Sequence, residues 1–150
     1  MSVGVLETIW VKRFKGGPMD PVAEARLDAG QGLAGNSDRG GKRQVTLLEA
    51  EVWEAVMQAM GAGLPPSTRR ANLLLRGLAL PRGKGEGAPG RILCLGEARL
   101  CILGPTTPCE QMEAALPGLE AALRPGWRGG VFGEVLTGGT IRTGDAVRWE

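Results

Sequence analysis

The sequence predicts a mainly β fold with inserted helices (α+β), closed into a small β-barrel. Its 150 residues include 25 glycines and 10 prolines, residue types that end strands and helices and form tight turns. Apolar residues make up 43 % of the chain, enough for a core, but most of them come in short runs. Many short strands joined by glycine turns, with a few helices between them, are typical of such barrels.

The first 43 residues predict one strand and one long polar loop. Apolar and polar side chains alternate imperfectly between Val3 and Val11, which indicates an opening strand that ends near Lys12. The sequence Gly16-Gly17-Pro18 breaks this strand. Residues 28–43 are rich in glycine and polar side chains, so we expect a turn-rich segment outside the core, of the kind that often carries function.

The clearest helical pattern covers residues 46–60, where apolar side chains recur at steps of four. Thr46 and Glu49 have the spacing of a capping box, and Gly61 follows as a stop signal. Residues 44–48 could instead close a strand, in which case the helix begins a few residues later.

The second half of the chain alternates between short strands and short helices. Thr107 as N-cap, Pro108 in the first helical position and Glu110 in capping-box spacing predict a helix, and residues 119–123 predict one or two further turns. We expect a connecting loop over residues 83–90, and a single domain over residues 1–150. Short apolar runs predict strands near residues 73–78, 92–95, 100–103, 131–136, 140–142 and 147–149.

Composition excludes several classes of function. Eighteen basic residues face sixteen acidic ones, and the net charge of +2 is too small for a nucleic-acid binder. The chain has no histidine and no tyrosine, which removes imidazole bases, histidine-ligated zinc and phenolic acids. No apolar run approaches eighteen residues, and the odd number of three cysteines does not suit a disulfide framework. We therefore expect a cytoplasmic protein that does not bind membranes.

Cys109 is the strongest candidate for chemistry. With Thr107 as N-cap, the thiol would occupy the second helical position, where free N–H groups and the helix dipole stabilise a thiolate. A small buried apolar cysteine is the alternative interpretation of the same residue. Cys94 and Cys101 lie inside apolar runs, and we expect both in the core. Their spacing does not suit a structural zinc site.

Basic side chains at predicted strand starts form a second candidate group. In a barrel, strand starts from distant parts of the sequence can surround one opening, where guanidinium groups suit phosphate or carboxylate ligands. Solvated surface charges would explain each residue equally well. The group comprises Lys42, Arg43, Arg69, Arg70 and Arg128, with Asn72 as a hydrogen-bonding neighbour and Gly129 and Gly130 at the expected rim.

The order and spacing of several segments resemble the MOSC domain, the small β-barrel named after the C-terminal part of molybdenum cofactor sulfurases. The resemblance runs along nearly the whole chain and implies a closed barrel of that type. In many small members the loop after the Gly-x-x-Gly element holds Asp and His, but this chain has Asn36 and Asp38, so no role of that histidine carries over. The matching segments are residues 32–36, 42–48, 69–78, 96–109, 128–131 and 139–147.

The resemblance implies that Cys109 is the characteristic cysteine of the family. It would ligate molybdenum of a molybdopterin cofactor, or carry sulfur as a persulfide received from and passed to partner proteins, with basic residues holding the pterin phosphate. One alternative is a molybdenum-dependent reductase of N-hydroxylated compounds that needs an external electron donor. A further alternative is a non-catalytic barrel that binds an anion or a partner. Pyridoxal phosphate is not expected, because sulfurases bind it in a separate domain.

Overall fold

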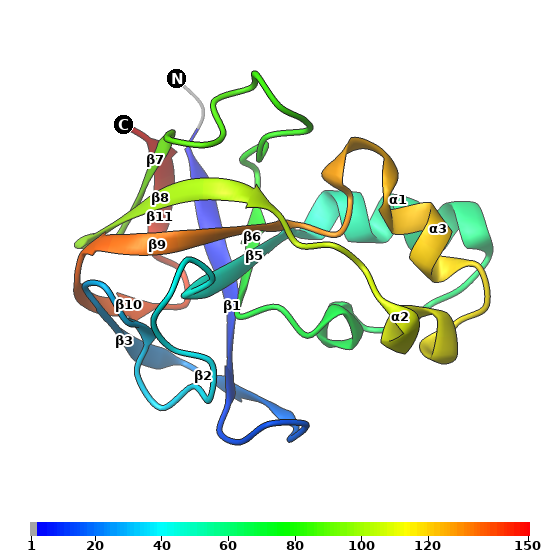
Figure 1. The fold of residues 1–150 in the computed structure, drawn as a ribbon, viewed down its shortest axis with the longest axis horizontal. Helices are drawn as coiled ribbons and strands as arrows, with labels where there is room; N and C mark the ends of the chain where they lie inside the picture. Colours follow the sequence, from blue (N-terminus) through cyan, green and yellow to red (C-terminus); the bar gives the residue numbers. More distant parts are fainter. Residues whose placement is uncertain (1–2) are drawn as a thin grey trace.

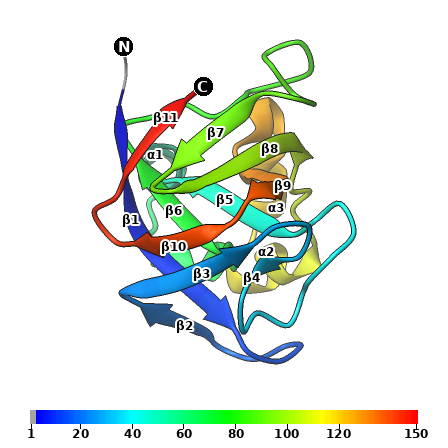
Figure 2. The same cartoon turned by 90° about the vertical axis from the view of Figure 1, so that its left-hand side faces the viewer.

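Seven strands close a barrel in the computed structural model, which describes residues 3–150 (Figures 1 and 2). Neighbours pair in the order β1, β6, β5, β9, β8, β7 and β11, and β11 pairs back onto β1. The β5–β6 pair is parallel and the other pairs of the ring are antiparallel. The ring strands are β1 (Gly4–Lys12), β5 (Val45–Glu49), β6 (Leu73–Arg76), β7 (Ile92–Leu95), β8 (Ala98–Pro105), β9 (Val131–Thr137) and β11 (Ala146–Trp149). The sequence prediction of a mainly β fold closed into a small barrel is confirmed.

The remaining strands lie outside the ring. β2 extends the sheet beyond β1, and a separate small sheet has the order β10, β3, β4. The sequence patterns indicated β10 but neither β3 nor β4, because only Leu27 in the polar strand β3 is buried. The bounds are β2 (Met19–Val22), β3 (Glu24–Asp28), β4 (Gly32–Leu33) and β10 (Gly139–Arg142).

The α-helices lie together on one side of the barrel (Figure 1). In the described part of the chain, no helix is long and apolar enough to cross a membrane. The helices are α1 (Ala50–Met60), α2 (Glu110–Ala115) and α3 (Leu119–Leu123), with 3-10 turns η1 (Pro66–Arg69) and η2 (Pro125–Trp127).

The capping box expected at Thr46 and Glu49 is wrong, and the alternative of a closing strand is correct. Thr46 belongs to β5, pairs with Phe132 of β9, and uses its hydroxyl to bind Asn72. Helix α1 begins only at Ala50, with Glu49 as an N-cap that makes no side-chain capping bond. The stop signal is confirmed, since Gly61 takes the left-handed conformation at φ 63°.

Two hydrophobic clusters share the wall formed by β5 and β6. Leu47 and Leu73 point into the barrel, while Leu48 and Leu74 point outward and pack with the helices. Successive side chains of a strand point to opposite faces, so these two strands are buried on both sides. The wall thus fixes the helices against the barrel and holds the segment between η1 and β6 in place.

Candidate functional site

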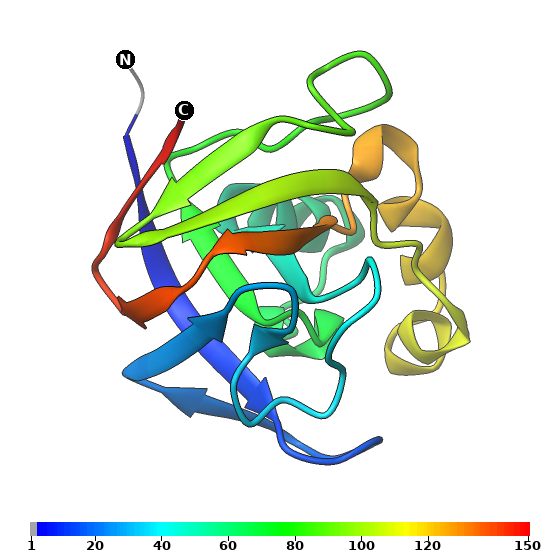
Figure 3. The same ribbon diagram turned by 60° about the vertical axis from the view of Figure 1, so that its left-hand side comes forward.

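A pocket of about 570 Å³ opens where the β4–β5 loop, the start of β2 and the segment leading into α2 meet. Figure 3 shows the β4–β5 loop and the α2 segment facing each other. The pocket is mostly polar, and its side chains come from five separate parts of the chain. They are Lys12, Met19, Asn36, Ser37, Asp38, Arg39, Arg43, Gln44, Thr46, Arg69, Arg70, Asn72, Thr107, Cys109 and Gln111.

Cys109 lines this pocket and is an exposed, free thiol. It is the N-cap residue of α2, with extended backbone at φ −128° and ψ −174°, and helical residues begin at Glu110. The expected assignment of Thr107 as N-cap and Cys109 as second helical residue is therefore wrong. Thr107 and Pro108 lie before the helix, in the segment that follows β8, whose last residue Pro105 still pairs with β9.

The other two thiols lie away from the pocket. Cys94 is buried, as expected for a core residue. Cys101 is only partly buried, which differs from the expectation, because it lies on the outward face of β8 where side chains alternate between buried and half-exposed. Partial burial raises the pKa of the Cys101 thiol, and the nearby charge of Glu134 raises it further.

Arg69 makes more side-chain hydrogen bonds than any other cation of the pocket. Its side chain is buried, with the residue 8 % exposed, and its guanidinium is held by backbone and hydroxyl acceptors. Nε donates to the Gly129 carbonyl at 2.8 Å, and Nη2 donates to the Thr106 carbonyl at 2.9 Å and to Thr106 Oγ1 at 3.1 Å. These acceptors on Thr106 and Gly129, here called the seat of Arg69, fix the plane of the guanidinium in the absence of a ligand.

No acidic side chain among residues 3–150 forms an ion pair with Arg69. Burial lowers the pKa of Arg69 to about 10, repulsion by Arg43 adds to this, and the charge of the Cys109 thiolate opposes it. Arg69 is therefore still a cation at neutral pH. Nη1 makes no hydrogen bond within the described residues. Every fully buried polar side-chain atom there has a hydrogen-bond partner, so Nη1 is not fully buried and is accessible from the pocket.

Arg43 and Arg70 add positive charge at the mouth. Arg43 is exposed and lies close enough to repel Arg69. Arg70 takes the left-handed conformation at φ 63°, which is uncommon for a residue with a side chain, and its Nη2 donates to the Gly17 carbonyl at 2.5 Å. Three guanidinium groups with no carboxylate paired to them in the described part of the chain thus line the same pocket as the thiol.

Asn72 lines the pocket, but its side chain forms its hydrogen bonds with other residues of the protein. Its Oδ1 accepts from the Thr46 backbone and hydroxyl, and its Nδ2 donates to the Trp10 carbonyl and to Asn36 Oδ1. Asn36 also accepts from the Lys12 backbone N–H at 2.8 Å. Asn72 therefore joins β1, β5 and the β4–β5 loop, and its role in the site is to hold these walls together.

The other candidate residues do not line the pocket. Gly129 and Gly130 lie behind Arg69, where the Gly129 carbonyl forms part of its seat and Gly130, at φ 99°, brings its backbone against the Leu47 carbonyl. Arg128 lines a separate hollow beside α1, and Lys42 is exposed next to Arg43 without contributing to the lining.

Several lining residues carried no sequence signal as site residues. Lys12 pairs with Asp38 at 2.5 Å, and Arg39 pairs with Asp28 at 2.7 Å, so these cations are already neutralised by the loop. Gln44 is buried and fastens the loop, since its side chain binds the Gly41 carbonyl and the Val135 N–H. Only the polar, glycine-rich composition of residues 28–43 indicated that this loop was a site element.

The donor set fits an anionic group better than a bare metal ion. Within residues 3–150 no three His, Cys, Asp or Glu side chains come together as metal ligands. Cys109 could supply one soft sulfur ligand to a metal that brings its other ligands with it. Such a metal would be part of an organic group whose anionic parts meet the unpaired guanidinium groups.

The sequence profile of the MOSC domain matches residues 12–148 of this chain. No curated protein sequence is similar enough to the chain to count as a match.

Several solved structures share the fold. The YuaD protein from Bacillus subtilis aligns with a TM-score of 0.78 at 19 % identity, covering 98 % of this chain and 97 % of that one. YiiM from Geobacillus stearothermophilus aligns with a TM-score of 0.76 at 19 % identity, covering 98 % and 75 %. YiiM from Escherichia coli aligns with a TM-score of 0.72 at 18 % identity, covering 100 % and 70 %. At these identities the likeness concerns the fold alone.

Proposed function

From the premise that the chain belongs to the MOSC domain family, we propose that Cys109 binds a molybdopterin-type cofactor as a thiolate ligand, or carries sulfane sulfur as a persulfide. One observation supports this above the others. The exposed Cys109 thiol shares a pocket with Arg69, a buried guanidinium that forms no ion pair within residues 3–150. A buried cation without a carboxylate partner is costly, and an anionic ligand beside the thiol would offset that cost.

The pocket suits a cofactor of this kind in size and charge. A volume of about 570 Å³ lies within the range of small-molecule sites, which is roughly 300–1,000 Å³. When bound, the cofactor would supply the redox chemistry of molybdenum. Cys109 would hold it through sulfur, Arg43 and Arg70 at the mouth would bind its phosphate, and Arg69 would stabilise negative charge near the thiolate.

Sulfur carriage is the second candidate, favoured by the exposure of Cys109. The Cys109 thiolate would attack the outer sulfur of a donor persulfide, so that a new S–S bond forms at Cys109. The donor's S–S bond breaks, and the donor leaves as a thiolate. Both the reacting thiolate and the product persulfide are anionic, and the guanidinium of Arg69 would favour both.

The test measures what the protein holds and which residue holds it. Protein expressed in a host that makes the cofactor is purified without oxygen, and bound molybdenum, bound pterin and the mass added to Cys109 are measured. We expect a bound cofactor or a persulfide in the wild type, its loss in Cys109→Ser, and a reduced amount in Arg69→Met. Cys101→Ser makes the same chemical change outside the pocket and serves as the matched control.

Three outcomes would replace or reject the proposal. Absence of molybdenum, pterin and persulfide even after loading with cofactor would reject it and favour a non-catalytic binding barrel. Equal loading of Cys109→Ser and wild type would reject the role of the thiol. Turnover of a hydroxylamine-type substrate with an external electron donor, abolished in Cys109→Ala, would show the reductase alternative.

A further inference from the structure

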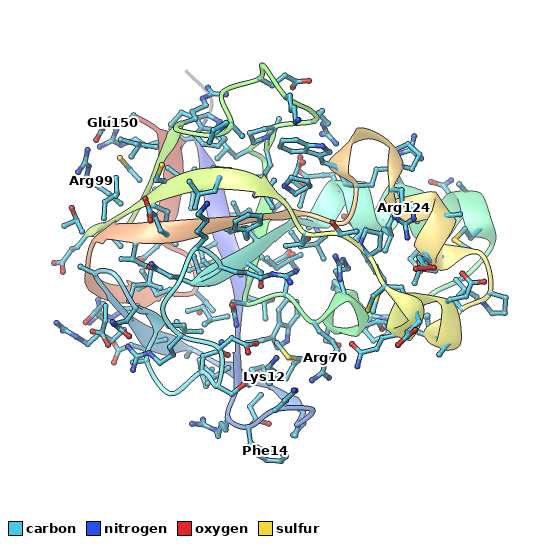
Figure 4. The ribbon with its side chains drawn as sticks, viewed as in Figure 1. Lys12, Phe14, Arg70, Arg99, Arg124 and Glu150 are labelled. Carbon is cyan, nitrogen blue, oxygen red and sulfur yellow. The ribbon has the colours of Figure 1, made fainter. Side chains whose placement is uncertain are left out.

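An exposed aromatic ring stands beside the mouth of the Cys109 pocket. Phe14 lies at the tip of the β1–β2 hairpin and is 62 % exposed, compared with 57 % for Val3 and 41 % for Leu136, the other exposed large apolar residues of the described chain. Figure 4 shows Phe14, Lys12 and Arg70 at the same end of the molecule, far from the Arg99–Glu150 pair. The hairpin tip therefore lies at the same end of the molecule as the pocket residues Lys12 and Arg70.

The Phe14 ring lies against the backbone of Gly17. An added Cβ at Gly17 would stand 2.8 Å from the ring, so a larger residue there would displace the ring from this position. The Gly17 carbonyl in turn accepts a hydrogen bond from Arg70, which lines the pocket. Exposed aromatic rings are frequent anchors in protein interfaces.

The charges around the ring are mixed but positive in balance. Arg13 pairs with Asp20 at 3.2 Å and Lys12 pairs with Asp38, so these two acids are neutralised, while the exposed Glu110 beside Cys109 forms no ion pair within residues 3–150. Within residues 3–150, the cations at this end that form no ion pair are Lys15, Lys42, Arg43, Arg69 and Arg70. Five of the nine cations that form no ion pair within residues 3–150 therefore lie at this end of the molecule, and the other four are Lys84, Arg91, Arg128 and Arg148.

We propose that Phe14, Lys15, Arg43 and Arg70, here called the hairpin rim, dock an acidic protein partner over the pocket. The partner would place an apolar hollow on Phe14 and carboxylates on the cations, and it would exchange the group held at Cys109, which rests on the proposed function. At this end of the molecule, ion-paired acids lie among the cations, and one apolar side chain is exposed; both features suit a protein partner. A nucleic acid would need continuous positive charge, and a membrane would need a wider apolar patch.

The test uses two synthetic peptides that carry a 2-pyridyl disulfide on one cysteine. One contains glutamates and a leucine near the cysteine, and the other has lysine in place of every glutamate. The Cys109 thiolate attacks the peptide sulfur, the peptide–Cys109 disulfide forms, and the old S–S bond breaks to release pyridine-2-thione, which takes up the proton. Its absorbance gives the rate, and 2,2′-dipyridyl disulfide gives the baseline reactivity of the thiol.

We expect the acidic peptide to react about tenfold faster than the lysine peptide at low salt, with the ratio falling as salt is added. Lys15→Glu should bring the ratio toward one, whereas Phe14→Ser and Gly17→Ala should slow both peptides, which share the leucine; none of the three should change the baseline rate. Leu136→Ser and Arg124→Glu make matching changes at exposed positions away from the rim, and should keep the wild-type peptide rates and ratio.

The outcomes separate the docking surface from the proposed function. A wild-type ratio near one with a normal baseline rate would overturn the docking surface alone. Phe14-dependent binding to phosphatidylglycerol vesicles, stronger than binding of the acidic peptide, would replace it with a membrane contact. A thiol inert to dipyridyl disulfide would count against the proposed function, and fluorescence anisotropy of a labelled acidic peptide would then still decide whether the rim binds it.

Discussion

Thr106→Val tests whether the seat of Arg69 is built as the structure indicates. The Thr106 hydroxyl is buried, donates to the Gly129 carbonyl at 2.7 Å and accepts from Arg69 Nη2 at 3.1 Å. Valine keeps the shape and removes both bonds. No partner is left unpaired, because the Gly129 carbonyl still accepts from Arg69 Nε and Nη2 still donates to the backbone carbonyl at position 106.

The cost therefore follows from two lost bonds and one gained methyl group. A neutral bond contributes about 1 kcal/mol and a bond to a charged group about 1.5 kcal/mol. Burial of the new methyl returns about 0.8 kcal/mol. We expect Thr106→Val to lower the free energy of unfolding by about 2 kcal/mol, or the melting temperature by roughly 4–8 °C.

Urea unfolding and a thermal melt measure this change. Thr137→Val is the matched control, since the Thr137 hydroxyl only accepts a long, exposed contact from Arg99 at 3.5 Å, and we expect a change within about 0.5 kcal/mol. If Thr106→Val unfolds within about 0.5 kcal/mol of the wild type, the hydroxyl does not support Arg69 and the reasoning on the seat is refuted.

Three further predictions concern the fold, its pH dependence and the thiols. Gly130→Ala should cost more than about 3 kcal/mol in an unfolding experiment, because its Cβ would stand 2.2 Å from the Leu47 carbonyl and φ is 99°. Burial raises the pKa of Glu49, so the folded state holds that proton more tightly. The wild type should thus gain stability relative to Glu49→Gln as pH falls from neutral toward the unfolded pKa of about 4.3, measured by urea unfolding at several pH values. Iodoacetamide should modify exposed Cys109 well before Cys101, whose thiol pKa is raised, as followed by peptide mass analysis at neutral pH.

Each of these has a contrary result. Gly63→Ala, where a Cβ meets nothing within 4 Å, should be tolerated, and equal stability of the two glycine variants would contradict the packing argument. A stability difference between wild type and Glu49→Gln that does not change with pH would contradict the burial of the carboxylate. Modification of Cys101 as fast as Cys109 would contradict the assigned exposures.

Hydrophobic periodicity and turn-forming residues in the sequence predicted many of the observed strands. Alternation over residues 3–11 predicted the strand observed at Gly4–Lys12, and the glycine-punctuated runs near the C-terminus predicted β9, β10 and β11. These signals are local, since they depend on which side chains recur on one face and which residues permit a turn. The sequence pattern did not predict strand β3, because this strand contributes a single buried side chain, Leu27, to the core.

Local signals failed where a side chain had two possible partners. Thr46 and Thr107 both fit an N-cap in the sequence, but Thr46 binds Asn72 at the start of the neighbouring strand β6, and Thr107 lies in the segment between β8 and α2. A capping residue competes with tertiary partners that lie far away in the sequence, so spacing alone does not decide between them. The argument for Cys109 from its helical position depended on this assignment, whereas the resemblance to the MOSC domain indicated Cys109 independently.

The sequence by itself determined the residue types that chemistry can use. With no histidine and no tyrosine, the site depends on a thiol, amides and guanidinium groups, and the basic residues at strand starts marked several of them. Only the tertiary structure decided which of these meet. Closure of the barrel brings Arg69, Arg70, Arg43 and Cys109 to one pocket, sends Arg128 to another face, and places Gly129 behind Arg69. Convergence of this kind depends on strand order and register, long-range pairings that no short stretch of sequence encodes.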